Sequence, residues 1–208
     1  MTEHTVKTPR GRIVANPPAA RFLFDDTRFA VVWLIVRVLA GLTWLQSGAH
    51  KLGDPAWMQT GEALKGFWTS AVKIPATGMP PIAFDWYRSF IQGMLDNQSY
   101  VWFAKLVAIG EFLVGVFLIL GLFVGIAAFF GAFMNWNYLM AGSTSLNPIL
   151  VVAALLLMLA WKTAGYYGLD RFVVPLLGAT WEDEDQTQKQ KRATAESASA
   201  PAERSTVS

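Results

Sequence analysis

Cysteine is absent from this 208-residue chain, and histidine is almost absent. Without a thiol the chain cannot form a disulfide, a thiolate zinc site, an iron–sulfur cluster or a persulfide intermediate. The two histidines are His4, in a charged N-terminal stretch, and His50. We therefore expect neither bis-histidine haem ligation nor a metal site.

Charge is also scarce. Only 15% of the residues are Asp, Glu, Lys or Arg, whereas a soluble domain carries about 25%. The charges gather at both ends and in one internal connection, which is typical of membrane spans joined to polar segments. The formal net charge of +2 is too small to indicate nucleic acid, so the expected partner is the lipid bilayer.

Four apolar stretches are long enough to cross a bilayer, which takes about 20 helical residues. They cover residues 29–48, 102–120, 122–141 and 148–165. The first follows a long polar lead and has no small-residue cleavage site after it, so we expect a retained span and not a secretory signal. The sequence predicts an all-α fold, a four-helix transmembrane bundle over residues 29–177.

The segments outside the spans are polar. Residues 1–28 form an N-terminal arm, and the composition of residues 178–208 predicts a disordered tail. The long connection, residues 49–101, contains several prolines, but its apolar residues recur at helical spacing after Asp54-Pro55, a typical helix start. It predicts an amphipathic helix, either lying on the membrane or covering a site between the spans.

Positive charge indicates the orientation. Lys and Arg are frequent in the N-terminal arm and after the fourth span, whereas the turn at residues 142–147 has no charge. Cytoplasmic segments carry the excess of Lys and Arg. We therefore expect a multi-pass protein of the plasma (inner) membrane with both termini cytoplasmic and the long connection outside.

Two ionisable residues lie deep within the spans, and such residues are costly unless paired or hydrated. Arg37 lies roughly 12 Å from the inner end of the first span, and Glu111 roughly 13 Å from the same end of the second. The matching depths predict that Arg37 and Glu111 face each other. Such a pair either only fixes helix register or forms a functional site, with Arg37 and Glu111 as catalytic residues.

A second polar group is expected nearer the outer face. Its members are Gln46, His50, Lys51, Lys105, Asn135 and Asn137, with Trp44, Trp136 and Tyr138 beside them. Asn135 and Asn137 cannot both face the bundle interior, because residues two apart on a helix diverge. The group either makes interhelical hydrogen bonds or lines a cavity suited to a quinone, which needs stacking surface and a few hydrogen-bond donors.

Three short motifs resemble those of one family. They are Arg37-x3-Gly41 with Gly48-x2-Lys51-Leu52, Gly110-Glu111-x3-Gly115 followed by Leu120-Gly121-Leu122, and Gly168-Leu169-Asp170-Arg171-Phe172. Their order and spacing resemble the DoxX/DoxD-like membrane proteins over about residues 30–175. We expect the glycines among them to allow close approach of the helices.

The resemblance implies a four-helix membrane bundle with family-typical residues at Arg37, Lys51, Glu111, Asp170 and Arg171. Members of the DoxD type are associated with a thiosulfate:quinone oxidoreductase that has a second, DoxA-type subunit. Members of the DoxX type are linked to membrane oxidoreductase complexes that handle thiol and oxidative stress. The long connection is closer in length to the DoxD type.

Three functions remain open at this point. The first is a redox subunit that supports thiosulfate:quinone oxidoreduction with a bound quinone and a partner oxidoreductase subunit. The second is a non-catalytic scaffold that anchors soluble oxidoreductases. The third is a small transporter or lipid-binding protein, for which four spans are few unless a homodimer forms.

Overall fold

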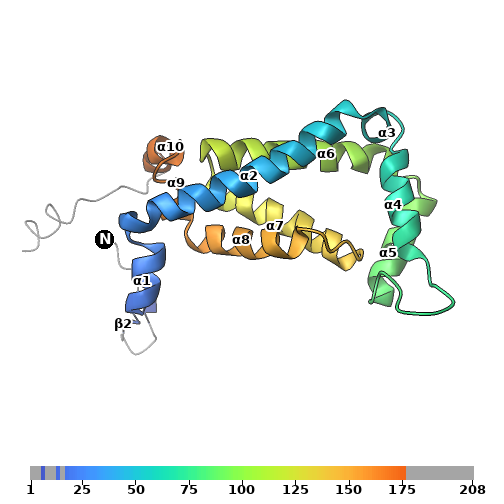
Figure 1. The fold of residues 1–208 in the computed structure, drawn as a ribbon, viewed down its shortest axis with the longest axis horizontal. Coiled ribbons are helices and arrows are strands. Elements are labelled where there is room, and N and C mark those ends of the chain that lie inside the picture. The colour runs from blue at the N-terminus through green and yellow to red at the C-terminus, as the bar shows by residue number, and fades with distance from the viewer. Residues whose placement is uncertain (1–5, 8–12, 15–16, 177–208) are drawn as a thin grey trace, which may run out of the picture. The chain divides into compact units, whose positions relative to one another are not determined.

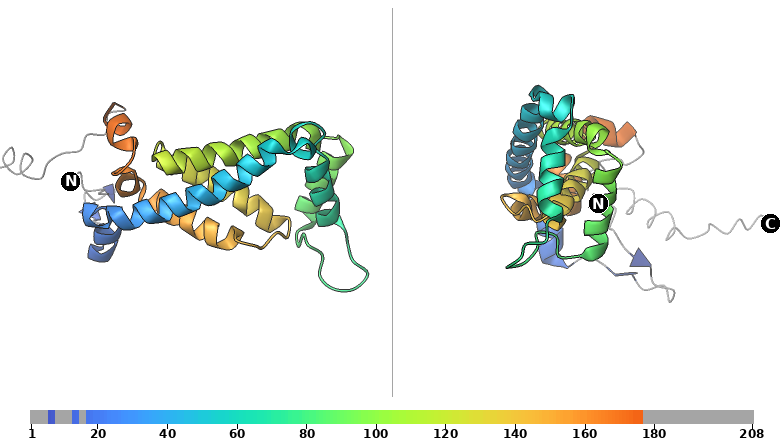
Figure 2. Two further views of the ribbon diagram at one scale, coloured as in Figure 1. Left: turned by 45° about the horizontal axis from the view of Figure 1, so that its top comes forward. Right: turned by 90° about the vertical axis from the view of Figure 1, so that its right-hand side faces the viewer.

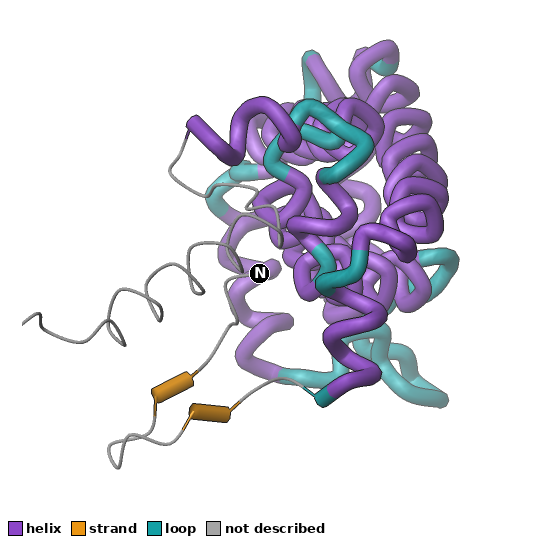
Figure 3. Tube along the Cα trace, turned by 90° about the vertical axis from the view of Figure 1, so that its left-hand side faces the viewer, coloured by secondary structure: helices purple, strands orange, loops and turns teal. Residues whose placement is uncertain are grey.

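The computed structural model describes residues 6–7, 13–14 and 17–176, so the predicted disordered tail lies outside the described residues. Residues 18–173 form one compact unit. The fold is all-α, as predicted. Within the described part of the N-terminal segment, β1 (Val6–Lys7) pairs with β2 (Ile13–Val14) as a two-residue antiparallel ladder (Figure 3).

The helices follow in chain order. They are α1 (Pro18–Phe24), the 3-10 helix η1 (Thr27–Phe29), α2 (Ala30–Gly53), α3 (Pro55–Met58), α4 (Glu62–Val72), α5 (Asp85–Asp96), α6 (Tyr100–Leu120), α7 (Val124–Met140), α8 (Asn147–Leu159), α9 (Trp161–Gly165) and α10 (Asp170–Leu176).

Four of these helices pack as a bundle. α2 lies along α6, α6 along α7 and α7 along α8, and α2 also contacts α8 (Figure 1). Two segments, Thr27–Gly53 with α2 and Tyr100–Leu120 with α6, are long and apolar enough to cross a membrane. Their outward faces are apolar, as shown by the exposed side chains of Ile35, Leu39 and Leu106. An apolar outer face suits lipid and not water.

The helix boundaries differ from the predicted ones mainly at two places. α2 continues to Gly53, five residues beyond the predicted end at Gly48. The fourth predicted stretch is interrupted at Ala160, between α8 and α9. The long connection contains three helices, α3, α4 and α5, which confirms that it carries helical structure.

Glycines allow α2 and α6 to touch through their backbones. A Cβ atom added at Gly48 would lie 2.4 Å from the backbone nitrogen of Phe112, and one added at Gly115 would lie 2.4 Å from that of Leu45. These two contacts show that the helices run antiparallel. They also fix the register, because Gly48 is level with Phe112 and Leu45 with Gly115. The prediction of close helix approach is confirmed here.

At one end of the bundle, α4 and α5 run across the ends of the long helices (Figures 1 and 2). Leu64 and Trp68 of α4 and Ile91 of α5 are buried together in a small hydrophobic core. The hydroxyl of Tyr87 on α5 donates to both the backbone and the side-chain oxygen of Asn137 on α7, each at 3.2 Å. The connection is therefore folded onto the bundle.

Candidate functional site

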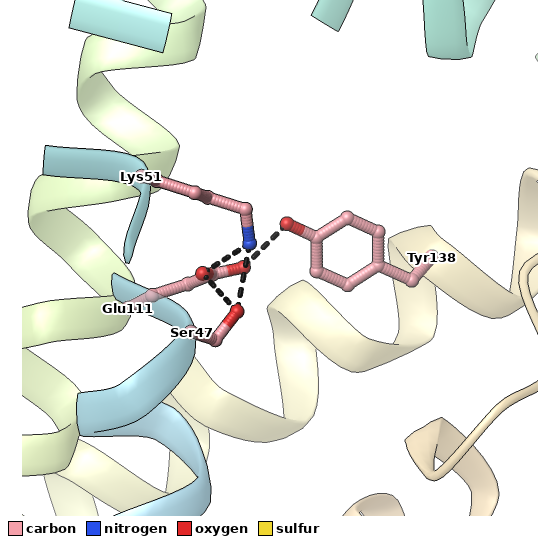
Figure 4. Close-up of polar contacts among 4 residues, drawn as sticks. All are labelled: Ser47, Lys51, Glu111 and Tyr138. Atoms are coloured by element: carbon pink, nitrogen blue, oxygen red, sulfur yellow. Dashed lines mark hydrogen bonds and ion pairs between the residues drawn. The ribbon is translucent and has the colours of Figure 1, made fainter. Parts of the chain in front are cut away.

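A buried carboxylate lies at the centre of a polar cluster near this end of the bundle (Figure 4). Glu111 is 1% exposed. Its Oε2 accepts a hydrogen bond from Ser47 Oγ at 2.8 Å and pairs with Lys51 Nζ, and its Oε1 accepts one from Tyr138 Oη at 2.5 Å. Lys51 Nζ also donates to Ser47 Oγ at 2.8 Å. We call these four residues the Glu111 cluster.

Three helices bring the cluster together. Ser47 and Lys51 are four residues apart on α2, so they share one face. Glu111 belongs to the inward stripe of α6, with Ala104, Ala108 and Gly115. The close approach at Gly48 brings this stripe within reach of the short Ser47 side chain. Tyr138 completes the cluster from the last turns of α7.

Aromatic rings of the long connection cover the cluster. Lys51 Nζ lies 5.0 Å from the ring centre of Trp57 on α3 and 5.7 Å from that of Tyr138, distances at which a cation and a ring attract. Phe67 on α4 packs edge-on against Tyr138, with 6.1 Å between ring centres. The side chain of Lys51 is 15% exposed, so only its edge reaches the surface.

The predicted contact between Arg37 and Glu111 is wrong. Glu111 is bound by Ser47, Lys51 and Tyr138. Arg37 lies on the same helix as Lys51 but 14 residues before it, a separation of about 21 Å along the axis. The prediction assumed that the ends of α2 and α6 are level. In the observed register, the first turns of α2 extend past the end of α6, so Arg37 lies beside Gly121.

Arg37 forms a second polar centre at the opposite end of α6. Its guanidinium lies between two glycines, so a Cβ atom at Gly121 would be 1.4 Å from Nη1 and one at Gly168 would be 2.6 Å away. Arg37 Nη2 donates to the carbonyl oxygen of Tyr167 at 3.4 Å, and within the described residues Nε and Nη1 are buried without a hydrogen-bond partner.

Asp170 connects this centre to α7. Its carboxylate accepts hydrogen bonds from the backbone N–H groups of Phe123 (2.6 Å) and Val124 (3.0 Å), so it caps an α7 N-terminus that has no local side-chain cap. Burial raises the pKa of the Asp170 carboxyl, while the two N–H groups and the charge of Arg37 act to lower it. We call Arg37, Gly121, Gly168 and Asp170 the Arg37 centre.

The other predicted site residues are dispersed. Gln46, His50 and Trp136 are exposed, and Lys105 is half-buried on α6, six residues before Glu111 and on another face. Trp44 belongs to the hydrophobic core. None of these five is a member of the Glu111 cluster.

The two asparagines face different ways, as predicted. Asn135 is fully buried in the bundle, and neither its Nδ2 nor its Oδ1 has a hydrogen-bond partner within the described residues. Asn137 faces the long connection and accepts from Tyr87. Burial raises the pKa of the Tyr87 hydroxyl, which keeps it a donor.

Sequence reasoning missed Ser47 as a site residue and placed Tyr138 only beside the outer polar group, without a contact to Glu111. The spacing of Ser47 and Lys51 was a usable signal, because residues at i and i+4 share one helix face. Tyr138 gave no comparable signal, since its contact with Glu111 depends on how α6 and α7 pack.

The arrangement favours a polar ligand that exchanges a proton. Lys51 and Tyr138 are donors, Glu111 is an acceptor or a proton carrier, and the rings of Trp57 and Phe67 offer stacking surface beside them. These groups fit a quinone ring oxygen chemically. Among the residues that the structure describes, no group of three or more His, Cys, Asp or Glu side chains is placed to hold a metal ion.

Comparison with known proteins gives one match. A family model described as DoxX matches residues 32–156, more than half of the chain. The matched range contains the whole Glu111 cluster and ends before Asp170. No curated protein and no solved structure matches the chain.

Proposed function

The chain belongs to the DoxX family of membrane proteins, and from this premise we propose that it is the quinone-binding subunit of a membrane oxidoreductase that oxidises thiosulfate. We propose further that α2, α6, α7 and the α8–α9 pair each cross the plasma membrane. Both termini then lie in the cytoplasm, and the Glu111 cluster lies near the outer surface.

The observation that carries the proposal is the buried Glu111 carboxylate, held by an ammonium and a phenol under aromatic rings. A bundle that needed only helix adhesion would be served by apolar side chains, because burying an ion pair brings little net stability. Ionisable groups within membrane helices mark functional sites more often than structural ones.

The reaction balances without a redox group on this chain. Two thiosulfate ions lose two electrons and join through a sulfur–sulfur bond as tetrathionate, and a quinone takes up those electrons with two protons to become quinol. The chain has no cysteine, and we assign the transfer of electrons from thiosulfate to quinone to a partner subunit. Here Glu111 exchanges a proton with a ring oxygen, Lys51 donates its third N–H to that oxygen, and Tyr138 holds the Glu111 carboxylate in place.

A scaffold is the second candidate, and one observation favours it. Each oxygen of Glu111 already has a partner within the protein. A cluster whose hydrogen bonds are all made within the protein also suits a purely structural role, in which it fixes the register of three helices. On this alternative the chain anchors soluble oxidoreductases and handles no quinone.

Quinone binding by the purified chain tests the proposal directly. A water-soluble ubiquinone analogue is titrated into the protein in mild detergent, and quenching of tryptophan fluorescence reports binding. We expect Glu111→Gln to weaken binding about tenfold, equivalent to about 1.4 kcal/mol. The matched control is Glu62→Gln, because Glu62 pairs with Lys65 on the exposed face of α4.

Membranes that also contain the partner subunit would then be assayed for thiosulfate-dependent quinone reduction. Loss of reduction in Glu111→Gln but not in Glu62→Gln supports the redox subunit. Equal binding by wild type and Glu111→Gln, with both proteins folded, contradicts the proposed site. Absence of any quinone binding by the wild type contradicts the proposed function and leaves the scaffold.

A further inference from the structure

The α5 helix presents two adjoining apolar faces, of which only one is covered. Tyr87 and Ile91 are buried against the rest of the protein, 5% and 3% exposed. Trp86 and Phe90 are 66% and 53% exposed. At about 100° per residue, Trp86 and Phe90 lie within about 40° of each other on the helix surface. A helix that only covered the bundle would need no second apolar face.

The remaining surface of α5 is polar. Ser89, Gln92 and Asp96 are exposed, and Gln92 Nε2 donates to Asp96 Oδ1 at 2.8 Å. These residues lie on the side of the helix away from Tyr87 and Ile91. The helix is thus divided into a packed face, an aromatic face and a water-facing face.

Two residues before α5 are also apolar and exposed. Phe84 is 53% exposed and Met79 is 93% exposed. Arg88 holds the end of this segment in place, because Nη1 donates to Asp85 Oδ1 and Nη2 to the carbonyl oxygen of Ile82, both at 2.6 Å. The loop of residues 73–84 extends away from the four long helices (Figures 1 and 2).

We propose that the aromatic face of α5, formed by Trp86 and Phe90, inserts into the headgroup region of the outer leaflet of the bilayer. Trp and Phe are typical of this region, where an amphipathic helix lies in the membrane plane. The orientation of α5 fits, because it runs across the bundle axis (Figure 1).

The helix α5 lies against the last turns of α7, because Tyr87 hydrogen-bonds Asn137. Trp136 and Phe133 are exposed on those turns of α7, 58% and 57%. Lipid that surrounds this part of α7 therefore also reaches the level of α5, which favours lipid over a separate protein partner.

Insertion of α5 into the headgroup region does not depend on quinone binding, but it affects the position of the helices that cover the Glu111 cluster. α4 packs on α5, and Phe67 of α4 contacts Tyr138. Contact between α5 and lipid then keeps α4, which covers the Glu111 cluster, at the membrane surface.

The absence of native cysteine allows a clean test with single-cysteine variants. Phe90→Cys and the control Gln92→Cys lie on the aromatic and the polar face of the same helix. Each full-length variant is labelled with a nitroxide in vesicles of phosphatidylcholine and phosphatidylglycerol. Accessibility to oxygen, which concentrates in lipid, is compared with accessibility to a water-soluble nickel chelate.

We expect the oxygen-to-nickel ratio at F90C to be several-fold higher than at Q92C. Equal ratios would show that the aromatic face meets water and would overturn the proposal. An F90C label inaccessible to both reagents would also overturn it, because a protein surface, such as a second copy of the chain, would then cover the face. Trp86→Cys gives the same test at the other residue of the aromatic face if F90C does not fold.

Discussion

The Glu111 cluster and the Arg37 centre both bury a charged side chain in the same bundle, but they stabilise it differently. Glu111 receives an opposite charge and two hydroxyl donors from neighbouring helices. Arg37 is enclosed mainly by backbone, between Gly121 and Gly168, with one carbonyl acceptor and the charge of Asp170 nearby. The first therefore depends on side-chain chemistry, and the second on the absence of side chains.

The largest effect is expected from removing the ammonium of the Glu111 cluster. Lys51→Met leaves Glu111 buried without its counter-charge, and breaking such a pair destabilises a protein by about 3–5 kcal/mol. The measurement is the free energy of unfolding in mixed detergent and SDS. Lys65→Met is the control, since the Lys65–Glu62 pair is on the surface and should change little. A double variant, Lys51→Met with Glu111→Gln, should recover part of the loss.

The stability contributed by the Arg37 centre should be most sensitive to a methyl group added at one of its glycines. Gly121→Ala places a methyl group 1.4 Å from Arg37 Nη1 at a residue with φ of +66°. Left-handed strain and overpacking together should cost about 2–4 kcal/mol, seen as a lower thermal midpoint in detergent. Gly53→Ala is the control, because nothing lies within 4 Å of its added methyl group. Equal thermal midpoints for the two variants would mean that the Arg37 guanidinium can move to another position without loss of stability.

Removing one hydroxyl should show how much more a hydrogen bond to a charged acceptor stabilises the protein than a hydrogen bond to a neutral acceptor. Tyr138→Phe deletes a donor to the Glu111 carboxylate and should cost about 1.5–3 kcal/mol. Tyr87→Phe deletes a donor to the neutral Asn137 and should cost about 0.5–1.5 kcal/mol. The comparison uses SDS unfolding of both variants. Equal losses in the two variants would contradict the stronger hydrogen bond expected at the Glu111 carboxylate.

The most local effect is expected at the α7 cap. Asp170→Ala removes the acceptor of two backbone N–H groups, a loss that by itself should cost about 0.5–2 kcal/mol, and it also removes the charge beside Arg37. Hydrogen exchange of the amides of Phe123 and Val124 should become faster. Asp96→Ala, which removes a surface carboxylate of α5, should leave those amides unchanged. Protection that persists in Asp170→Ala would show that another group caps the helix.

Hydropathy was sufficient to locate the main helices. The predicted stretches 102–120 and 122–141 agree closely with α6 and α7, because each helix needs a long apolar run of its own. The glycine contacts between α2 and α6 were also predictable in kind, because glycine in such helices permits close packing. The break at Ala160 was not predicted, since no proline or glycine in the sequence marks it.

Composition and hydropathy were enough to predict the helical fold, the membrane class and the two charged groups that must be neutralised. They were not enough to predict which partner neutralises each group. That choice depends on the register of α2 against α6, which Gly48 and Gly115 fix through backbone contacts. A shift of a few turns would bring Arg37 toward Glu111 and remove Lys51. Register arises from contacts between residues far apart in the chain. The pairing of Lys51 with Glu111, and the place of Arg37 between two glycines, therefore follow from the packing of the helices and could not be read from the sequence pattern.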